Sequence, residues 1–289
     1  MKKSNIFNSP RLLGFRKEKR RILIKKIIFR TFVVFLFLIG LSFLSKWQKI
    51  NIDSINIIGN KVIEVKEIEN VIKENINGNY FWFFPKANFL LYPKKTIEEE
   101  LFQRFKRIDA MSLNVINFKT LEVSLSERIA LYTWCGVTPY RPNEEKERCY
   151  FLDENGFIFD EAPYFSGEVY LKFYGGVGVN EGSPSGLYFI EPNFKRLIAL
   201  REMVEDGGIK PAVFYIEDSG DVRMFLSSLY KSRMGPEIIL KMESDFNKIV
   251  ENLQSVLATE PLRKDFKDKY ASLLYIDLRF GNKVYYKFQ

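Results

Sequence analysis

The sequence predicts an α+β protein that is carried by a single N-terminal transmembrane helix. Three features lead to this prediction: one long apolar stretch near the N-terminus, segments in which apolar and polar residues alternate, and segments whose apolar residues recur at helical spacing. After the apolar stretch, these segments predict a domain with the order β-α-α-β-β at residues 50–128. A β-rich domain with a mostly antiparallel sheet and packed helices is expected at residues 129–289.

Residues 27–45 are apolar except for Arg30. A bilayer core of about 30 Å requires roughly 20 such residues, so we expect a transmembrane helix here. Arg30 is close enough to the end of the helix to reach the headgroups. A cleaved signal peptide is the alternative, but no A-x-A-like cleavage site follows Leu44, and Lys46-Trp47 is typical of an interfacial anchor.

Basic residues are concentrated ahead of the apolar stretch. The first 30 residues hold eleven Lys or Arg and one acid, Glu18, and so carry +10, whereas the whole chain has a formal net charge of +8. The positive-inside rule therefore predicts a cytoplasmic tail at residues 1–26 and an extracytoplasmic remainder. Because the remainder is slightly acidic, we expect the tail to contact anionic lipid and expect no nucleic-acid partner.

The chain contains no histidine. The commonest general base and metal ligand are therefore missing, and Ser/His or Cys/His nucleophile pairs cannot form. Carboxylate chemistry stays open, but the acidic clusters have structural interpretations. Glu98–Glu100 follow Thr96 in the pattern of a helix start, and Asp153–Gly156 has the composition of a hairpin turn. We expect no catalytic residue, no cofactor and no small-molecule substrate.

The two cysteines, Cys135 and Cys149, lie in the part expected outside the cytoplasm, where a disulfide can form. Such a bond would close a loop of about 15 residues and stabilise the fold by about 3 kcal/mol. Two free thiols in a compartment that is not oxidising are the alternative. A metal site is not expected, because two Cys without His fall short of the usual zinc ligands.

Periodicity assigns the elements of the first domain. A strand ends at Gly59-Asn60, two amphipathic helices follow, and two strands complete the order. The predicted elements are a strand around Ile55–Ile57, helices at Val65–Ile76 and from a Thr96 cap to Phe105, and strands at Ile108–Ile116 and Lys119–Ser126. In the second domain, one helix is expected from Pro192 to Gly207-Gly208 and another from a Ser244 cap to Leu257.

The end of the sequence predicts a β-hairpin. Alternation places Asp277 and Arg279 on one face of its first strand, and Leu274, Ile276, Leu278 and Phe280 on the other. A two-residue turn at Gly281-Asn282 would mix apolar and charged side chains on each face. We therefore predict a three-residue loop that pairs Phe280 with Val284. Nothing in the sequence follows the last strand to cover its outer edge, and an uncovered edge is a liability unless a partner uses it.

Five short motifs follow one another along the chain: Ile55-x-Ile57-x-Gly59-Asn60, Gly78-Asn79-Tyr80-Phe81, Thr120-Leu121-x-Val123-x-Leu125-x-Glu127-Arg128, Tyr150-Phe151-Leu152-Asp153-x-x-Gly156-x-Ile158-Phe159 and Tyr275-Ile276-Asp277-Leu278-Arg279-Phe280. Their order after one membrane anchor resembles the bacterial cell-division family FtsQ/DivIB, and the first domain resembles a POTRA domain. The chain departs from the family at Phe118 and Ala130, where proline is common. The segment between the cysteines resembles an insertion.

The resemblance implies a non-enzymatic scaffold at the division septum that helps to control septal peptidoglycan synthesis. Its partners would be single-span coiled-coil division proteins similar to FtsB/DivIC and FtsL, and its terminal strand would pair with a segment of these partners by β-augmentation. Phe280, Val284, Tyr285, Tyr286 and Lys287 would then carry the contacts. The competing interpretation is that these are ordinary sheet residues.

Two other functions fit the sequence. A surface-anchored wall-binding or carboxylate-based wall-cleaving enzyme would need two acids roughly 5 to 9.5 Å apart in a cleft. A POTRA chaperone of a translocation system usually has repeated POTRA units, and no second β-α-α-β-β pattern is visible in the sequence.

The aromatic run Tyr80–Phe84 has two interpretations. The first is packing in the core of the first domain, which we prefer. The second is contact with the membrane interface or with a neighbouring membrane helix, because few residues separate Trp47 from the first strand.

Overall fold

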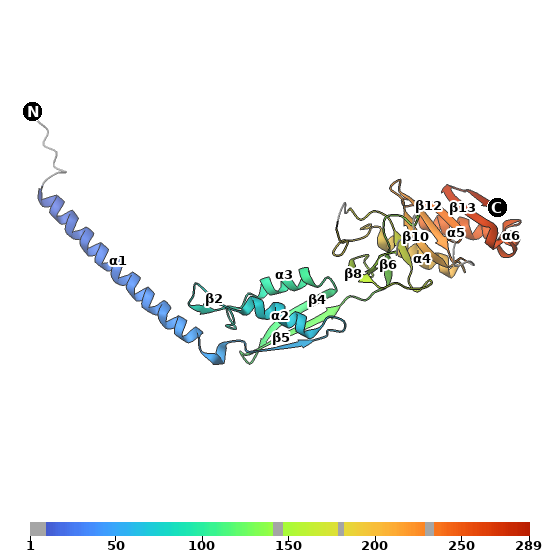
Figure 1. Cartoon of the computed structure of the whole chain (residues 1–289). Helices are drawn as coiled ribbons and strands as arrows, with labels where there is room; N and C mark the ends of the chain where they lie inside the picture. Colours follow the sequence, from blue (N-terminus) through green and yellow to red (C-terminus); the bar gives the residue numbers. More distant parts are fainter. Residues whose placement is uncertain (1–9, 141–146, 179–181, 229–233) are drawn as a thin grey trace, which may run out of the picture. The chain divides into compact units, whose positions relative to one another are not determined.

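The computed structural model describes residues 10–140, 147–178, 182–228 and 234–289. The chain is a mixed α+β protein that forms two compact units (Figure 1). One unit comprises Met1–Gln103 and Ala110–Leu125, and the other comprises Arg104–Asp109 and Ser126–Gln289. The predicted α+β class with a large, mostly antiparallel sheet is confirmed.

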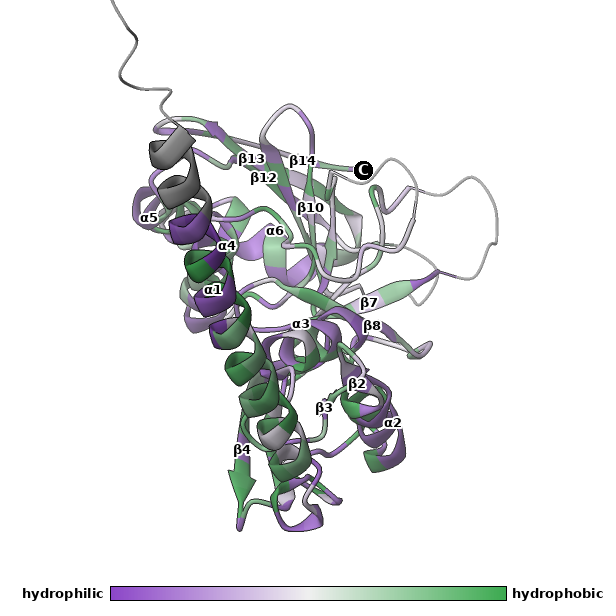
Figure 2. Ribbon diagram, turned by 90° about the vertical axis from the view of Figure 1, so that its left-hand side faces the viewer, coloured by the Kyte–Doolittle hydropathy of each residue, from purple (hydrophilic) through white to green (hydrophobic). Residues whose placement is uncertain are grey.

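Helix α1 spans Pro10–Ser45, and its part Glu18–Ser45 is long and apolar enough to cross a membrane. It is the one such helix in the part of the chain that the structure describes. Figure 2 shows that it is hydrophobic over its C-terminal part and hydrophilic further upstream. The helix begins at Pro10, well before residue 27, because the Lys, Arg, Leu and Ile residues of the predicted tail have high helix propensity. The first nine residues of that tail lie outside the described residues.

The first unit contains the predicted strands and helices in the order in which they were expected, with a small hairpin between the two helices. Strand β5 lies between β1 and β4, and it runs parallel to β1. The bounds are β1 Ser54–Ile58, α2 Val65–Ile76, β2 Asn79–Tyr80, β3 Phe84–Pro85, α3 Lys94–Arg104, β4 Ile108–Ile116 and β5 Thr120–Glu127, with the 3-10 helix η2 at Gln48–Ile50 ahead of them.

The apolar faces of the helices and strands form the core of the first unit. Ile68 and Ile72 of α2 are fully buried, as are Leu121 and Val123 of β5. Each such side chain contributes about 1.5–3 kcal/mol through burial. The predicted Thr96 cap is wrong: α3 begins two residues earlier, directly after a proline whose fixed φ suits a helix start.

The second unit is built on a nine-stranded sheet with the order β14-β13-β12-β11-β10-β9-β6-β7-β8. Helices α4 and α5 pack against each other and against the sheet. The strands are β6 Tyr132–Trp134, β7 Cys149–Leu152, β8 Ile158–Ala162, β9 Lys172–Tyr174, β10 Pro211–Ile216, β11 Asp221–Leu226, β12 Glu237–Lys241, β13 Leu273–Phe280 and β14 Lys283–Phe288; the helices are α4 Phe194–Asp206, α5 Phe246–Leu257, α6 Leu262–Asp268 and the 3-10 helix η3 Tyr270–Ser272.

Local signals set several boundaries in this unit. The predicted turn after β7 is present, and Asp153 Oδ1 accepts hydrogen bonds from the amides of Asn155 and Phe157. Helix α5 is capped by Asp245, whose side chain accepts from the amide of Asn247, so the predicted Ser244 cap is wrong by one residue. Both residue types are good caps, and sequence alone does not separate neighbours of this kind.

A pair of glycine substitutions tests the first unit. Gly59 has φ +94°, and a Cβ there would lie 2.0 Å from the carbonyl oxygen of Leu125, whereas Gly78 has φ +87° and open space around it. We expect Gly78→Ala to cost about 1–2 kcal/mol from backbone strain, and Gly59→Ala to cost at least about 3 kcal/mol because β5 must also move. Hydrogen exchange of the β5 amides in the full chain measures both. Equal protection in the two variants would contradict this packing.

Candidate partner-binding site at the sheet edge

Strand β14 is at one edge of the nine-stranded sheet and, among the described residues, has one neighbouring strand, β13 (Figure 1). An edge strand has a row of backbone N–H and C=O groups that its own sheet does not use. The five candidate contact residues lie on this strand or at the end of β13. The terminal hairpin therefore has the backbone groups that strand addition requires.

The register of this hairpin differs from the prediction. Phe280 pairs with Lys283, so the turn has the two residues Gly281-Asn282, and the predicted three-residue loop is wrong. The register shifts between this pair and the pair Asp277–Tyr285, where β13 has one residue more than β14. This β-bulge resolves the parity conflict, because the extra residue changes which side chains share a face.

The bulge places Phe280 on the opposite face from Leu278. Leu278 is buried at 1% exposure, whereas Phe280 is 55% exposed and makes an edge-to-face contact with Tyr285 at 5.3 Å between ring centroids. Tyr285 is itself 50% exposed. Two neighbouring aromatic rings on an edge strand offer a partner apolar area at little conformational cost.

The other candidates are divided between the two faces of β14. Lys287 and Tyr286 are exposed, but the Tyr286 ring lies 6.0 Å from that of Phe288, which packs against the core. Val284 is half-buried and also packs against the core. The structure therefore brings Phe280 and Tyr285 together, and turns Val284 toward the interior.

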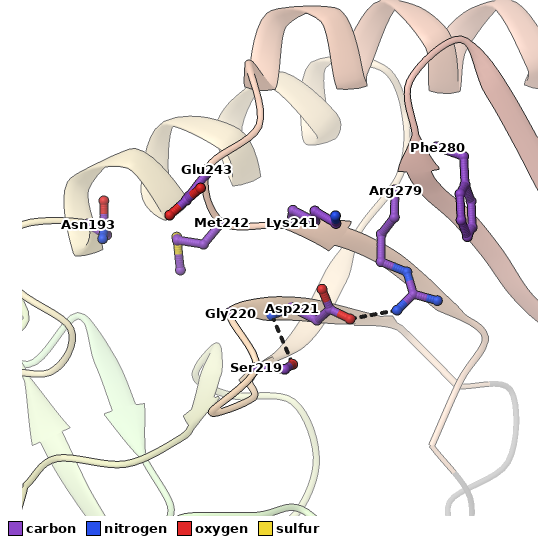
Figure 3. A pocket seen from close by; sticks show the side chains of 9 residues that line it. All are labelled: Asn193, Ser219, Gly220, Asp221, Lys241, Met242, Glu243, Arg279 and Phe280. Atoms are coloured by element: carbon purple, nitrogen blue, oxygen red, sulfur yellow. Dashed lines mark hydrogen bonds and ion pairs between the residues drawn. The ribbon is translucent and has the colours of Figure 1, made fainter.

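Arg279 holds the bulge in place. Its Nε and Nη2 donate to the two carboxylate oxygens of Asp277 at 2.9 and 2.6 Å, and Asp277 Oδ1 also accepts from the Arg279 amide at 3.1 Å. Its Nη1 donates to Asp221 Oδ2 at 2.5 Å, as Figure 3 shows. Because Asp221 lies on β11, this one guanidinium connects strands that are two apart in the sheet.

These contacts shift the pKa values of both groups. Burial alone would raise the pKa of Asp277, but hydrogen bonds from the side chain and amide of Arg279 outweigh it and lower the pKa. The hydrogen bonds to Asp277 raise the pKa of Arg279 despite partial burial. Both groups are therefore ionised around neutral pH, and the pair persists as a charged, bidentate contact.

A second guanidinium on the same sheet forms a similar cluster. Arg223 donates to Glu217 through Nε and to both oxygens of Glu237 at 3.0 and 3.1 Å. Burial opposes its charge, but the hydrogen bonds to the two glutamates raise the pKa of Arg223. Sequence reasoning missed both clusters. The available signal was the Asp277-x-Arg279 pattern within a strand, which marks one contact of the first cluster; the partners Asp221, Glu217 and Glu237 follow no local pattern.

A pocket of about 670 Å³ opens beside the bulge (Figure 3). Its wall includes charged groups of both signs, and Phe280 lies at its side. The carboxylate of Asp221 forms an ion pair with Arg279, and this ion pair connects strands β11 and β13. The lining residues are Asn193, Ser219, Gly220, Asp221, Lys241, Met242, Glu243, Arg279 and Phe280.

Cys135 and Cys149 are joined by a disulfide with 14 residues of separation. The bond connects the end of β6 to the start of β7 and closes the intervening segment, of which residues 141–146 lie outside the described part. Glu147 offers a carboxylate oxygen close to the two sulfurs, but its oxygens pair with Lys172 and with the hydroxyl of Tyr174. The group is therefore a local crosslink with an ion pair beside it.

No model of a known protein family matches this chain, and no curated protein matches it either.

Replacing Asp277 by Asn tests the contact that holds the bulge. The folded pKa of Asp277 is lowered, so its stabilisation is complete above the unfolded pKa of about 4 and is lost as pH falls through the folded value. We expect Asp277→Asn to lower the free energy of unfolding by about 1.5–3 kcal/mol at pH 7, and by progressively less below pH ~4. Urea unfolding of the full chain in detergent, with Trp47→Phe and Trp82→Phe in every variant so that fluorescence comes from Trp134, measures this difference.

Asp206→Asn is the control, because Asp206 is exposed at the end of α4. It should stay within about 0.5 kcal/mol of the parent protein at every pH. A loss in Asp277→Asn that does not change with pH would contradict the ionic account of the bulge.

The disulfide gives a further prediction. For a loop of this length, Cys135→Ala/Cys149→Ala should lower the free energy of unfolding of the second unit by about 3 kcal/mol. Reductant should destabilise the parent protein by a similar amount and leave the double variant unchanged. If reductant leaves the parent protein unchanged as well, the cysteines are not crosslinked.

Proposed function

We propose that this chain is a non-enzymatic, membrane-anchored scaffold of the FtsQ/DivIB type. In this proposal α1 crosses the membrane, the basic tail is cytoplasmic, and both units are extracytoplasmic at the division septum. The second unit binds single-span coiled-coil partners similar to FtsB/DivIC and FtsL, and through them the protein helps to control septal peptidoglycan synthesis.

The observation that carries the proposal is the outer side of β14, with which no strand of the described residues pairs. Its neighbour β13 is fixed in register by Arg279, so the edge presents backbone groups in a defined position. A partner segment can extend the sheet by pairing with them, and alternate side chains can select the partner. Phe280 and Tyr285 supply exposed aromatic surface beside that edge.

Charge on the strand supports the same assignment. Lys283 and Lys287 are exposed on β14, and the strand contains no acid. Acidic side chains on an added strand would face them favourably. The competing interpretation is that β14 is an ordinary edge strand, whose lysines protect it from unwanted pairing. The half-exposed aromatic pair favours a partner, because protection alone gives no reason to expose rings.

Membrane anchoring is supported by α1. Its segment Glu18–Ser45 is one continuous helix with an apolar stretch long enough to cross a membrane, and basic residues are concentrated at the N-terminal side of that stretch. Such an asymmetry retains the N-terminus in the cytoplasm. A wall-cleaving enzyme is the alternative, and it would have to use carboxylates such as Asp221, whose ion pair with Arg279 favours a structural role.

Capture from native membranes tests the proposal. Full-length protein, solubilised in mild detergent, should capture small single-span coiled-coil proteins. In Tyr285→Glu/Tyr286→Glu, the amount of captured protein should fall at least about tenfold, because two charges at a strand interface remove apolar contact and add unpaired charge. Quantitative mass spectrometry of the captured proteins measures the loss.

The matched control changes two exposed tyrosines of the same unit that are not on β14, in Tyr164→Glu/Tyr188→Glu. It should keep the capture of the parent protein. Equal capture by both double variants would show that the partner does not bind at β14. Release of cell-wall fragments, with no such proteins captured, would support the enzyme instead.

A further inference from the structure

The short β2–β3 hairpin of the first unit exposes large aromatic side chains. Phe81 is 89% exposed, Trp82 is 88% exposed and Phe83 is 53% exposed. The preferred interpretation of this run as core is therefore wrong for the tip of the hairpin, whereas Tyr80 and Phe84 are half-buried. Three adjacent exposed aromatic residues form an unusual surface for a water-soluble domain.

The backbone at the tip is held in a conformation that large side chains rarely adopt. Phe81 has φ 47° and Trp82 has φ 67°, and the pairing of Tyr80 with Phe84 closes the loop. Left-handed backbone costs roughly 1–2 kcal/mol per residue for side chains of this kind. A glycine or asparagine would avoid that cost, so the presence of two aromatic residues points to a use for their side chains.

Hydrogen bonds connect this hairpin to the last turns of α1. Ser42 Oγ donates to the carbonyl of Phe83 at 2.9 Å, and Asn88 Nδ2 donates to the carbonyl of Ser45 at 3.2 Å. Ser42, Ser45 and Asn88 are all buried. The hairpin therefore lies beside the C-terminal end of the helix (Figure 1).

This connection sets the depth of the aromatic tip. Ser42 lies one turn before Lys46, which corresponds to about 6 Å along the helix axis. If α1 crosses the membrane up to Ser45, the carbonyl of Phe83 lies about 4.5 Å inside that end, near the boundary between the acyl chains and the outer headgroups. Lys49 lies over the ring of Trp47, and Lys86 lies over the ring of Tyr80, so aromatic and basic side chains occur together here as in an interfacial belt.

We infer that the tip Phe81–Phe83 inserts into the outer lipid–water interface beside α1, and that it holds the first unit against the membrane surface. This inference rests on the membrane anchoring in the proposed function. The occupant of the aromatic surface is lipid, because the hairpin is fixed to the flank of the only described helix that could span a membrane. Two contacts, the helix and the hairpin tip, restrict rotation of the unit about the end of the helix.

Quenching by brominated lipid tests the inference. The full chain is reconstituted in vesicles, and Trp47→Phe provides the parent protein, whose emission comes from Trp82 and the buried Trp134. Lipids brominated near the headgroup end of the acyl chain should quench it more strongly than lipids brominated near the chain end. Trp47→Phe/Trp82→Phe should lose this quenching, and aqueous iodide should reach Trp82 poorly.

The outcomes separate the two proposals. If the chain does not float with the vesicles, the anchoring fails and the inference fails with it. If it floats but Trp82 is quenched by iodide and not by brominated lipid, the inference alone is overturned. Shielding of Trp82 from both quenchers would also overturn it, because the ring would then be covered by protein, such as a neighbouring membrane helix.

Phe81→Ser/Trp82→Ser provides a second measurement that does not depend on fluorescence. Both side chains are almost fully exposed, so their removal should leave the fold of the unit unchanged. In vesicles, the variant should show faster hydrogen exchange of the β2 and β3 amides than the parent protein. The amides of β4 and β5 should exchange alike in the two proteins, because these strands are distant in sequence from the tip and their core is unchanged. No difference in vesicles would contradict insertion.

Discussion

The guanidinium of Arg279 fixes the part of the molecule on which the proposed function depends. It binds both oxygens of Asp277 on its own strand and reaches Asp221 on β11. These bonds hold the β-bulge that turns Leu278 into the core and Phe280 out to solvent. Without the bulge, a two-residue turn would place apolar and charged side chains on the same faces, and the edge strand β14 would have no defined surface.

Two ends of the chain serve different partners in this account. The first unit continues from α1 and exposes aromatic residues beside the helix, which suits lipid. The second unit ends its sheet in an edge with the pair Phe280 and Tyr285, which suits a protein segment. The chain has no histidine, and the carboxylate of Asp221 in its pocket is paired with arginine. These properties agree with the proposed scaffold, which is anchored in a membrane and binds a partner segment at the edge of its sheet.

Sequence periodicity predicted the elements whose buried residues recur at regular helix or strand spacing. The bounds of α2 and the inward residues of β5 follow directly from apolar spacing. Features that depend on competition or on distant residues were missed. Asp245 displaced Ser244 as a cap, the bulge in β13 overturned a sound parity argument, and the Arg279–Asp221 contact joins residues that no local pattern relates. Exposure of the tip at Trp82 was only the second interpretation of the aromatic run, because apolar character alone predicts burial.

The central claim is that a partner pairs with the outer side of β14. Hydrogen exchange of the full chain in lipid nanodiscs, with and without the coiled-coil proteins that it captures, tests this most directly. The account predicts slower exchange of the amides of residues 283–289 on binding, with the opposite edge strand β8 unchanged. A bound complex in which β14 exchanges as fast as in the free protein would contradict it.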